Sequence, residues 1–145
     1  MTVPNAVSLI TLGVADVEAA AAFYERLGWQ RSSASVEGDV AFFATTTGAV
    51  VGLWGSGDLA ADARATPPSP GTFRGVALAI NCASREEADA VLAAASAAGA
   101  TVPKPAEATE WGGYSGYFAD PDGHVWEVAH NPFWPLDDAH RVTLP

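Results

Sequence analysis

Three residues near the C-terminal end of the chain could take part in chemistry together: His124, Glu127 and His130. Imidazole and carboxylate groups are common metal ligands, and a His-x-x-Glu spacing brings its two side chains together on a helix. The neighbouring Val125 and Trp126 instead predict a strand, on which successive side chains point to opposite faces. His124 and His130 would then share one face while Glu127 points to the other, so we expect no metal site from these three residues.

Glu127 by itself has three interpretations. In an apolar cleft its pKa would rise, and it could act as a general base, although one carboxylate without an electrophile is an incomplete active site. It could instead recognise a ligand through its charge. It could also be a structural carboxylate held by a backbone or arginine partner, and the sequence leaves the three interpretations open.

Two other potential nucleophiles are expected to be inert. Ser115 lies in a Gly113–Tyr117 segment that is not a nucleophile elbow, because the second glycine comes one residue too early and no helix follows. Cys82 is the only cysteine in the chain and has no cation near it in sequence, so we expect a small buried residue. A single cysteine cannot form an internal disulfide, which is typical of a cytoplasmic protein.

The composition excludes several classes of partner. The 145 residues include 7 Lys+Arg and 17 Asp+Glu, giving a net charge of −10, so there is little positive charge with which to bind a nucleic acid. No signal sequence is recognisable at the N-terminus. No uncharged apolar run reaches the about 20 residues that cross a bilayer, so we expect no membrane partner.

Apolar periodicity predicts a β-α-β-β-β unit in the first part of the chain. Asp16 is a plausible N-cap of the helix, and Gly28 is a plausible end because glycine tolerates a left-handed backbone. The expected elements are a strand at 8–14, a helix at 17–27 and strands at 29–36, 40–44 and 49–54. The glycine- and proline-rich segment 55–72 is typical of a linker.

The same pattern then repeats. Ser84 and Glu87 form a capping-box signature before an alanine-rich helix that ends near Gly99. The expected strands are 76–80, 101–102, 114–119 and 125–129. We therefore predict one α+β domain over residues 1–145, with a first module at about 6–55, a linker at 56–72, a second module at 73–131 and a tail at 132–145. The paired βαβββ modules should form a curved mixed sheet around a cleft.

Three segments carry a family resemblance: Leu12–Asp16, Ala22–Gly28 and Tyr117–Val128. They resemble the vicinal oxygen chelate superfamily, which includes glyoxalase I, bleomycin-resistance proteins, extradiol dioxygenases and fosfomycin-resistance enzymes. The resemblance extends from about residue 8 to residue 131 and implies the paired-module fold. It also implies a homodimer, because related proteins are often dimers and some build their cavities between subunits. The apolar tail could then pack against the partner.

Enzymes of this superfamily hold a divalent metal with four side chains, usually His and Glu. The corresponding positions here are Leu9, Gly52, about Gly75 and Glu127, so one possible ligand of four is present. One carboxylate holds a divalent cation weakly. The resemblance, with these departures, implies a protein without a metal or other cofactor.

Hairpin turns predict which residues would line the cleft. A four-residue turn at 120–123 would pair Gly116 with Glu127, and a turn at 45–48 would pair Phe43 with Val50. Alternation adds residues of the first strand, and a tryptophan before the second hairpin could form a rim. The expected ligand-binding residues are Leu9, Thr11, Phe43, Val50, Trp54, Trp111, Tyr114, Phe118 and Glu127.

These residues would form an apolar, aromatic cleft with one carboxylate. Such a cleft suits an aromatic or cationic organic compound that stacks on Trp54 and pairs with Glu127. We therefore expect metal-independent binding of the bleomycin-resistance kind, and the acidic surface would attract cations. The alternatives are a metal-free lyase or isomerase with Glu127 as base, a metal-dependent glyoxalase or dioxygenase, or aromatic side chains that fill a closed core.

Overall fold

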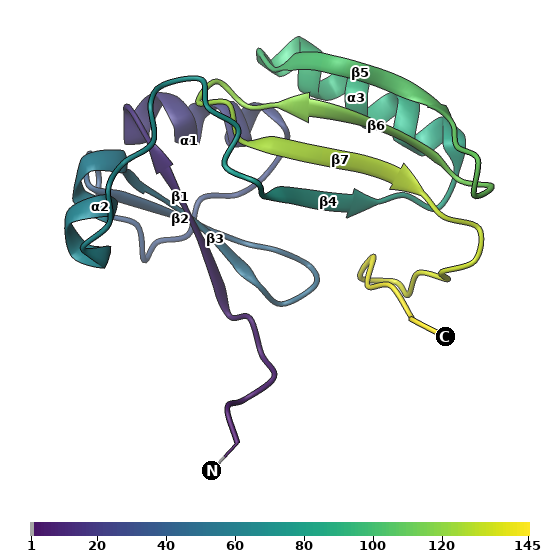
Figure 1. The fold of residues 1–145 in the computed structure, drawn as a ribbon, viewed down its shortest axis with the longest axis horizontal. Helices are drawn as coiled ribbons and strands as arrows, with labels where there is room; N and C mark the ends of the chain where they lie inside the picture. The colour runs from purple at the N-terminus through teal and green to yellow at the C-terminus, as the bar shows by residue number, and fades with distance from the viewer. Residues whose placement is uncertain (1) are drawn as a thin grey trace.

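The computed structural model describes residues 2–145 (Figure 1). The elements in this range follow the predicted α+β order, except that one helix is additional and one predicted strand is missing. They are β1 (Leu9–Val14), α1 (Val17–Arg26), β2 (Val40–Ala44), β3 (Val50–Gly55), α2 (Ser56–Ala63), β4 (Ala77–Asn81), α3 (Arg85–Ala98), β5 (Thr101–Ala108), β6 (Tyr114–Ala119) and β7 (Val125–His130).

The first module has a mixed sheet in the order β1-β3-β2, with α1 on one face. Strand β1 runs parallel to β3, and β2 runs antiparallel to it. Asp16 caps α1 as predicted, because its side chain accepts a 3.0 Å hydrogen bond from the Ala19 amide. Alternate strand residues, including Leu12, Val14 and Leu53, are buried with α1 in the core.

The strand predicted at 29–36 is wrong, because this segment makes only isolated bridges, Arg31 to Phe43 and Val36 to Val40. Serine hydroxyls explain the difference. Ser35 Oγ accepts a 2.9 Å hydrogen bond from the Phe42 amide, and Ser32 Oγ accepts one of 3.1 Å from the Ala34 amide. Side chains that bond nearby backbone groups compete with a regular ladder.

The second module has a sheet in the order β4-β7-β6-β5, covered by α3. The predicted cap at Ser84 is confirmed, because Ser84 Oγ accepts a 3.1 Å hydrogen bond from the Glu87 amide. The Glu87 side chain reaches back one residue further than in a standard capping box and accepts a hydrogen bond from the Ala83 amide. Helix α3 ends at Gly99, whose φ of 110° is left-handed as expected. Strand β5 is longer than predicted, and it tolerates its prolines because it lies at the sheet edge.

Helix α2 occupies the start of the segment that we interpreted as linker. Its alanines favour a helix, and it packs on the face of the first sheet opposite α1, where Gly13 leaves space. A Cβ atom on Gly13 would lie 3.1 Å from Ser56 Oγ and 3.4 Å from Leu59 Cδ2. The part of the segment without regular structure is therefore shorter than expected and begins after α2.

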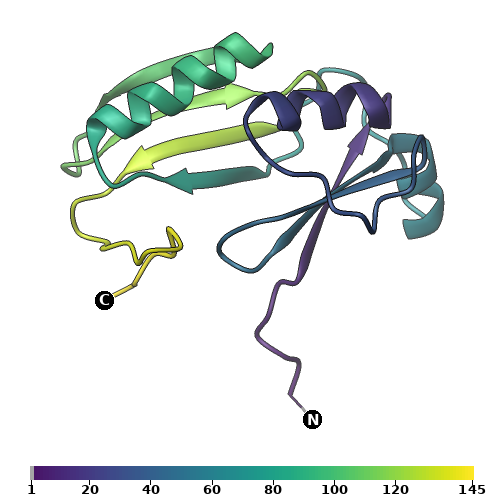
Figure 2. The ribbon, with the colours of Figure 1, turned by 180° about the vertical axis from the view of Figure 1, so that it is seen from behind.

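The two sheets have separate hydrogen-bonded ladders within residues 2–145, and their strands run in different directions (Figure 1). Helices α1 and α3 lie on the same side of the molecule, in front of the sheets when it is seen from behind (Figure 2). Side chains of both modules share one core, in which the α1 aromatic Tyr24 lies 6.1 Å from Trp126 of β7 between ring centroids. Within residues 2–145, none of the helices is both long and apolar enough to span a bilayer.

Candidate functional site

The β6–β7 turn is one residue longer than predicted, and this changes which side chains lie beside Glu127. Ala119 pairs with Val125, so the connection comprises residues 120–124. Tyr117 therefore lies opposite Glu127, and Phe118 lies opposite Trp126 on the other face. Because side chains alternate along a strand, a shift of one residue moves each one to the opposite face. The predicted grouping of Tyr114 and Phe118 with Glu127 is wrong.

Both displaced aromatic residues lie on the helix side of the second sheet. Phe118 is 1 % exposed and stacks on Trp126, with ring centroids 6.0 Å apart and planes 6° apart. The Tyr114 hydroxyl donates a 2.7 Å hydrogen bond to Asp89 of α3, and the Arg85 guanidinium lies 5.1 Å from the Tyr114 ring centroid. These contacts stabilise the packing of α3.

The β2–β3 turn shows the same one-residue difference. Ala44 pairs with Val50, and the Thr45 hydroxyl donates a 2.6 Å hydrogen bond to the Ala49 carbonyl across the loop. Phe43 consequently pairs with Val51 and is fully buried against α1, so its predicted place in the cleft is wrong. Phe42 takes that place on the face opposite α1, which α2 covers in part and which we name the open face. The sequence gives no signal that distinguishes these adjacent phenylalanines, because the difference depends on the loop length.

Four predicted residues do share the open face of the first sheet. Leu9 pairs with Val50, and Thr11 pairs with Gly52, whose missing side chain leaves room for the Phe42 ring. Trp54 lies on the same face, opposite Val40. The face of Leu9, Thr11, Val50 and Trp54 was therefore predicted correctly, and their part in binding stays a prediction.

Glu127 lies on the open face of the second sheet, where its partner is a phenol. The Tyr117 hydroxyl donates a 2.8 Å hydrogen bond to Glu127 Oε2, which raises the pKa of Tyr117. Ala79 of β4 lies on the other side of Glu127.

The two predicted tryptophans and Glu127 lie outside the cavities described below. Trp54 belongs to the first sheet, and neither Trp54 nor Glu127 lines either cavity. The predicted rim residue Trp111 is 51 % exposed and lies over Gly113, also outside both cavities.

The donor set does not fit a divalent metal. Leu9 and Gly52 have no ligating atom in their side chains, and Gly75 precedes β4. His124 Nε2 lies 2.7 Å from the Gly13 carbonyl, and His130 Nδ1 lies 3.0 Å from the Cys82 carbonyl. In the described range 2–145, no group of three or more His, Cys, Asp or Glu side chains is arranged to hold a metal ion.

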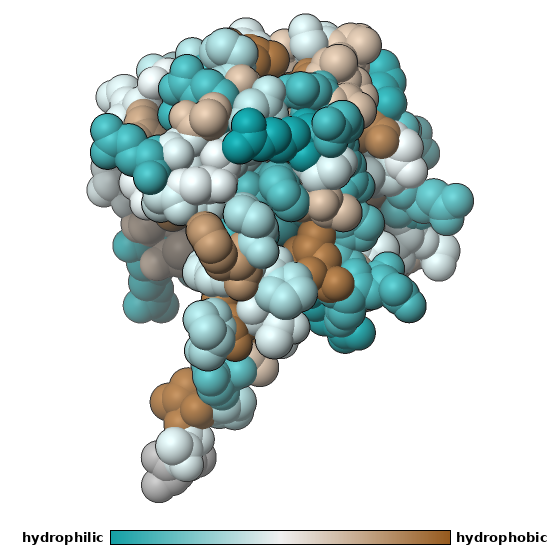
Figure 3. All heavy atoms as spheres, turned by 90° about the vertical axis from the view of Figure 1, so that its right-hand side faces the viewer, coloured by the Kyte–Doolittle hydropathy of each residue, from teal (hydrophilic) through white to brown (hydrophobic). Residues whose placement is uncertain are grey.

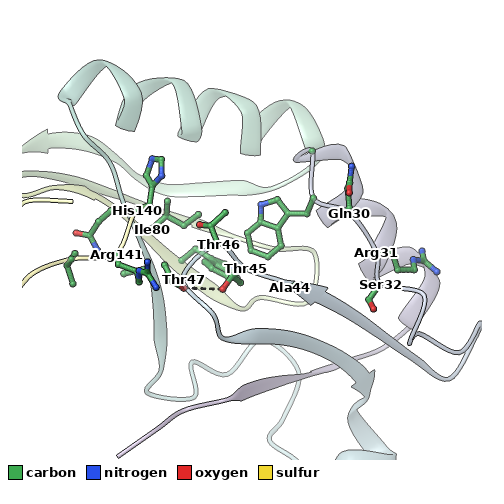
Figure 4. Close-up of a pocket in the computed structure, with 16 residues that line it drawn as sticks. Gln30, Arg31, Ser32, Ala44, Thr45, Thr46, Thr47, Ile80, His140 and Arg141 are labelled. Atoms are coloured by element: carbon green, nitrogen blue, oxygen red, sulfur yellow. Dashed lines mark hydrogen bonds between the residues drawn. The ribbon is translucent and has the colours of Figure 1, made fainter. Parts of the chain in front are cut away.

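The larger cavity, which we name the tail cavity, has a volume of about 1050 Å³ and lies between the two modules. Its walls come from residues 28–32, the β2–β3 loop, the end of β4 and the C-terminal tail. Figure 4 shows Thr46 and Ile80 among the lining side chains, and a dashed line joins the Thr45 and Thr47 hydroxyls, which are 3.0 Å apart.

Two tryptophans form the aromatic part of the tail cavity. Half-buried Trp29 packs edge-on against buried Trp126, with ring centroids 5.6 Å apart. Trp29 was not among the residues predicted from sequence, because it falls in the segment 29–36 that was expected to form a regular strand. Its position directly after Gly28, which ends the preceding helix, was the available signal.

The basic side chains of the tail cavity are already paired with carboxylates. Arg31 lies 2.7 Å from both Glu18 and Glu25, and these contacts raise the pKa of Arg31. The Gly38 amide, followed by Arg31, lowers the pKa of Glu18. The other two basic groups are on the tail: His140 pairs with Glu87 of α3 at 3.1 Å, and Arg141 pairs with Asp137 at 2.8 Å. The remaining polar groups that line the cavity are uncharged amides and hydroxyls.

The C-terminal tail packs on its own chain. The Thr46 hydroxyl donates a 2.8 Å hydrogen bond to the Ala139 carbonyl, which joins the tail to the first module. His140 contacts Glu87 of α3, which joins the tail to the second module. Leu136 and Val142 form a β-bridge within the tail. The tail is therefore a structural wall of the cavity.

A smaller cavity of about 400 Å³, which we name the linker cavity, lies between β1, α2 and the segment that leads into β4. Its lining is mainly apolar, and Thr11 is the one predicted ligand-binding residue in it. Arg74 and His124 also line it, and the sequence analysis did not single out Arg74. The first half of β4 borders this cavity and the second half borders the tail cavity.

Comparisons with known proteins agree with this architecture. Residues 6–128 match the family described as the Glyoxalase/Bleomycin resistance protein/Dioxygenase superfamily, and the chain belongs to this superfamily. No curated protein matches the sequence. The superfamily assignment that the sequence motifs suggested and the predicted α+β fold class are thus both confirmed.

Solved structures with the same fold span a range of sequence identities to this chain. A glyoxalase-related enzyme from Fulvimarina pelagi is 36% identical, with a TM-score of 0.86 over 97% of this chain and 99% of that chain. A lactoylglutathione lyase from Agrobacterium tumefaciens is 24% identical, with a TM-score of 0.68 over 92% and 99%. A glyoxalase/bleomycin resistance protein/dioxygenase from Nocardioides is 22% identical, with a TM-score of 0.74 over 100% and 93%.

Proposed function

We propose that this protein binds a neutral aromatic organic molecule reversibly in the tail cavity, without a metal ion. The observation that carries the proposal is the combination of Trp29 and Trp126 with basic groups that are each paired with a carboxylate. Aromatic rings offer a large apolar contact area, while the nearby threonine hydroxyls and amides can orient a few polar atoms. A charged ligand would have to compete with the existing ion pairs.

This proposal changes one part of the expectation from sequence. A cationic ligand was expected because Glu127 would supply a counter-charge beside Trp54, but Glu127 does not line the tail cavity. Pockets of about 300–1,000 Å³ hold most small organic ligands, so the tail cavity is large enough for one of several rings. Binding of the bleomycin-resistance kind, in which the compound is sequestered unchanged, remains the proposed activity.

The experiment titrates 2-naphthol, coumarin and indole calorimetrically into EDTA-treated protein. Saturable binding is expected for at least one probe in the wild-type protein and in Trp111→Leu, whose ring lies outside the cavity. Trp29→Leu should lose most of the affinity. Affinity that is equal in the two variants, or no binding of any of the three probes, would contradict the proposal. Mass spectrometry should recover the bound probe unchanged.

A metal-free lyase or isomerase that uses Glu127 as its base is the second candidate. The hydrogen bond donated by the Tyr117 hydroxyl fixes the orientation of the Glu127 carboxylate, and it places a proton donor beside the proposed base. A relative that is 36% identical is described as an enzyme, which favours this candidate. If the wild-type protein converts a bound compound and Glu127→Gln still binds this compound but no longer converts it, the enzyme candidate is established. Full turnover in Glu127→Gln would exclude this base.

We also propose that the protein is a cytoplasmic homodimer. Exposed apolar side chains lie along the N-terminal segment, which projects from the body of the molecule and includes Val3 and Val7 (Figure 3). Sedimentation velocity tests the oligomeric state, and a monomer at all concentrations would contradict the proposed dimer.

The proposed cytoplasmic location is supported by the free cysteine. Burial raises the pKa of the Cys82 thiol to about 12, which protects the thiol from oxidation. A free thiol is compatible with a reducing compartment.

A further inference from the structure

The linker cavity combines apolar walls with a basic end. Leu59 and Ala60 of α2 form one wall, and Phe73, Val76 and Leu78 form another. Its volume of about 400 Å³ accommodates a short acyl chain or a small ring system. Arg74 and His124 are next to each other on the side formed by the β6–β7 turn. Water in such a space would meet few polar partners, so an apolar group is favoured.

Hydrogen bonds fix how the basic end is built. The Gly13 carbonyl can only accept, so His124 Nε2 donates the 2.7 Å hydrogen bond between them. In this tautomer the neutral ring leaves Nδ1 free to accept, and Arg74 Nη2 lies 3.3 Å from it. The same Arg74 nitrogen donates to the Asp122 carbonyl at 3.3 Å. The His124 ring therefore holds the Arg74 guanidinium in place.

The Arg74 charge has no carboxylate partner in the structure of residues 2–145. Its contacts are a carbonyl and an imidazole, whereas Arg31 and Arg141 contact carboxylates within 4.0 Å. Arg74 Nη2 makes both contacts, so the hydrogens on Nε and Nη1 are available to a ligand. A carboxylate can accept a single charge-assisted hydrogen bond from one of these nitrogens.

We propose that the linker cavity is a second binding site, which takes an amphipathic organic anion: a carboxylate attached to a short apolar chain. The chain lies between α2 and the Phe73–Leu78 segment, and the carboxylate pairs with Arg74. This site differs in both chemistry and place from the tail cavity. The two cavities lie along different halves of β4, and no residue lines both.

The test uses octanoate, octanamide and octylammonium as probes, each titrated calorimetrically into the full-length protein. Aliphatic probes are chosen because they cannot stack on the tryptophans of the tail cavity. We expect octanoate to bind at one site and octanamide to bind about tenfold more weakly, which is the effect of losing one charge-assisted interaction. Octylammonium should bind least. Equal binding of octanoate and octanamide, or no binding of octanoate, would overturn the proposal.

Variants then separate the two ends of the site. Arg74→Gln should remove the preference for octanoate over octanamide, while Arg64→Gln, which removes the same charge outside the cavity, should keep it. Ala60→Phe should fill the space between the walls and abolish binding of both probes. If Arg74→Gln behaves like Arg64→Gln, or if Ala60→Phe binds octanoate normally while retaining its circular dichroism spectrum, the site assignment is wrong.

The same titration distinguishes this inference from the function proposed for the tail cavity. Trp29→Leu should bind octanoate with unchanged affinity, because Trp29 does not line the linker cavity. Loss of octanoate binding in Trp29→Leu would place the anion in the tail cavity and overturn the second site. Failure of the naphthol, coumarin and indole titrations would leave the octanoate result unaffected.

Discussion

The Tyr24 hydroxyl donates a buried 2.6 Å hydrogen bond to Asp120 Oδ2, which joins α1 of the first module to the β6–β7 turn of the second. The Trp126 indole donates a 3.2 Å hydrogen bond to the same hydroxyl. Asp120 Oδ1 accepts hydrogen bonds from the amides of Asp122 and His124, so the carboxylate also organises the turn. One carboxylate therefore sets both the contact between the modules and the conformation that presents His124 to the linker cavity.

Tyr24→Phe should destabilise the protein by about 1.5–3 kcal/mol, because it removes a hydrogen bond to a charged group and leaves the Trp126 indole without its acceptor. Urea unfolding measures the change. Tyr114→Phe is the matched control, since it also removes a tyrosine hydroxyl bonded to an aspartate, but at an exposed contact between β6 and α3. A loss in Tyr24→Phe no greater than in Tyr114→Phe would contradict the structural role of the buried bond.

The same tyrosine predicts an alkaline limit of stability. Burial, and then the neighbouring Asp120 charge, raise the pKa of Tyr24 well above the ordinary value. A folded-state pKa above the unfolded one means that this stabilisation is complete below about pH 10 and decreases as the pH rises further, because the unfolded chain ionises first. The free energy of unfolding, measured by urea titration from pH 8 to 11, should fall more steeply for wild type than for Tyr24→Phe. Parallel curves would disprove this.

Glu87 predicts an acid limit through its cap. The Ala83 amide, followed by His140, lowers the pKa of Glu87 below its ordinary value. Because the pKa is lower in the folded state, the ionised Glu87 carboxylate stabilises the protein at pH values above the unfolded-state pKa of about 4.3. This stabilisation is lost as the pH falls through the folded-state pKa. Glu87→Gln should reduce stability by about 0.5 kcal/mol at pH 7, a small amount because the site is partly solvated, and by less at pH 3. Thermal unfolding at both pH values checks this, with Glu86→Gln as the exposed control.

The register of the β2–β3 hairpin is testable with adjacent phenylalanines. Phe43→Ala should cost about 3–5 kcal/mol of unfolding free energy because it leaves a cavity in the core under α1. Phe42→Ala should cost much less, since Phe42 is only half-buried on the open face. Guanidinium unfolding of the two variants compares them. A larger loss for Phe42→Ala would restore the register predicted from sequence.

Metal binding is testable without knowledge of the ligand. Native mass spectrometry and elemental analysis after exposure to Zn, Mn, Ni and Fe(II) should find no stoichiometric metal, because only Glu127 supplies a donor among the four expected positions. One metal per chain that is lost in Glu127→Gln would contradict the donor analysis. Metal that persists in this variant would indicate another set of ligands.

Much of the architecture could be predicted because its signals are local. The N-caps at Asp16 and Ser84 and the terminal glycine Gly99 each require only a few neighbouring residues, and all three occur in the structure. The βαβββ order of the second module follows from the apolar periodicity of its strands and helix. In the first module the same signal predicted one strand too many, at 29–36. The mismatch with the superfamily's metal ligands also follows directly from residue types, because leucine and glycine side chains have no donor atoms.

The site depended on features that the tertiary structure decides. Each hairpin loop is one residue longer than its turn sequence indicated, and because a strand has a period of two, this moved Phe43, Tyr114 and Phe118 to the helix-facing sides. The two cavities exist because α2, the tail and the two sheets meet around β4, and the contacts that hold them, such as Arg74 with His124, join residues far apart in the chain. Local sequence determines where helices and strands form, while the packing between them determines which side chains share a cavity.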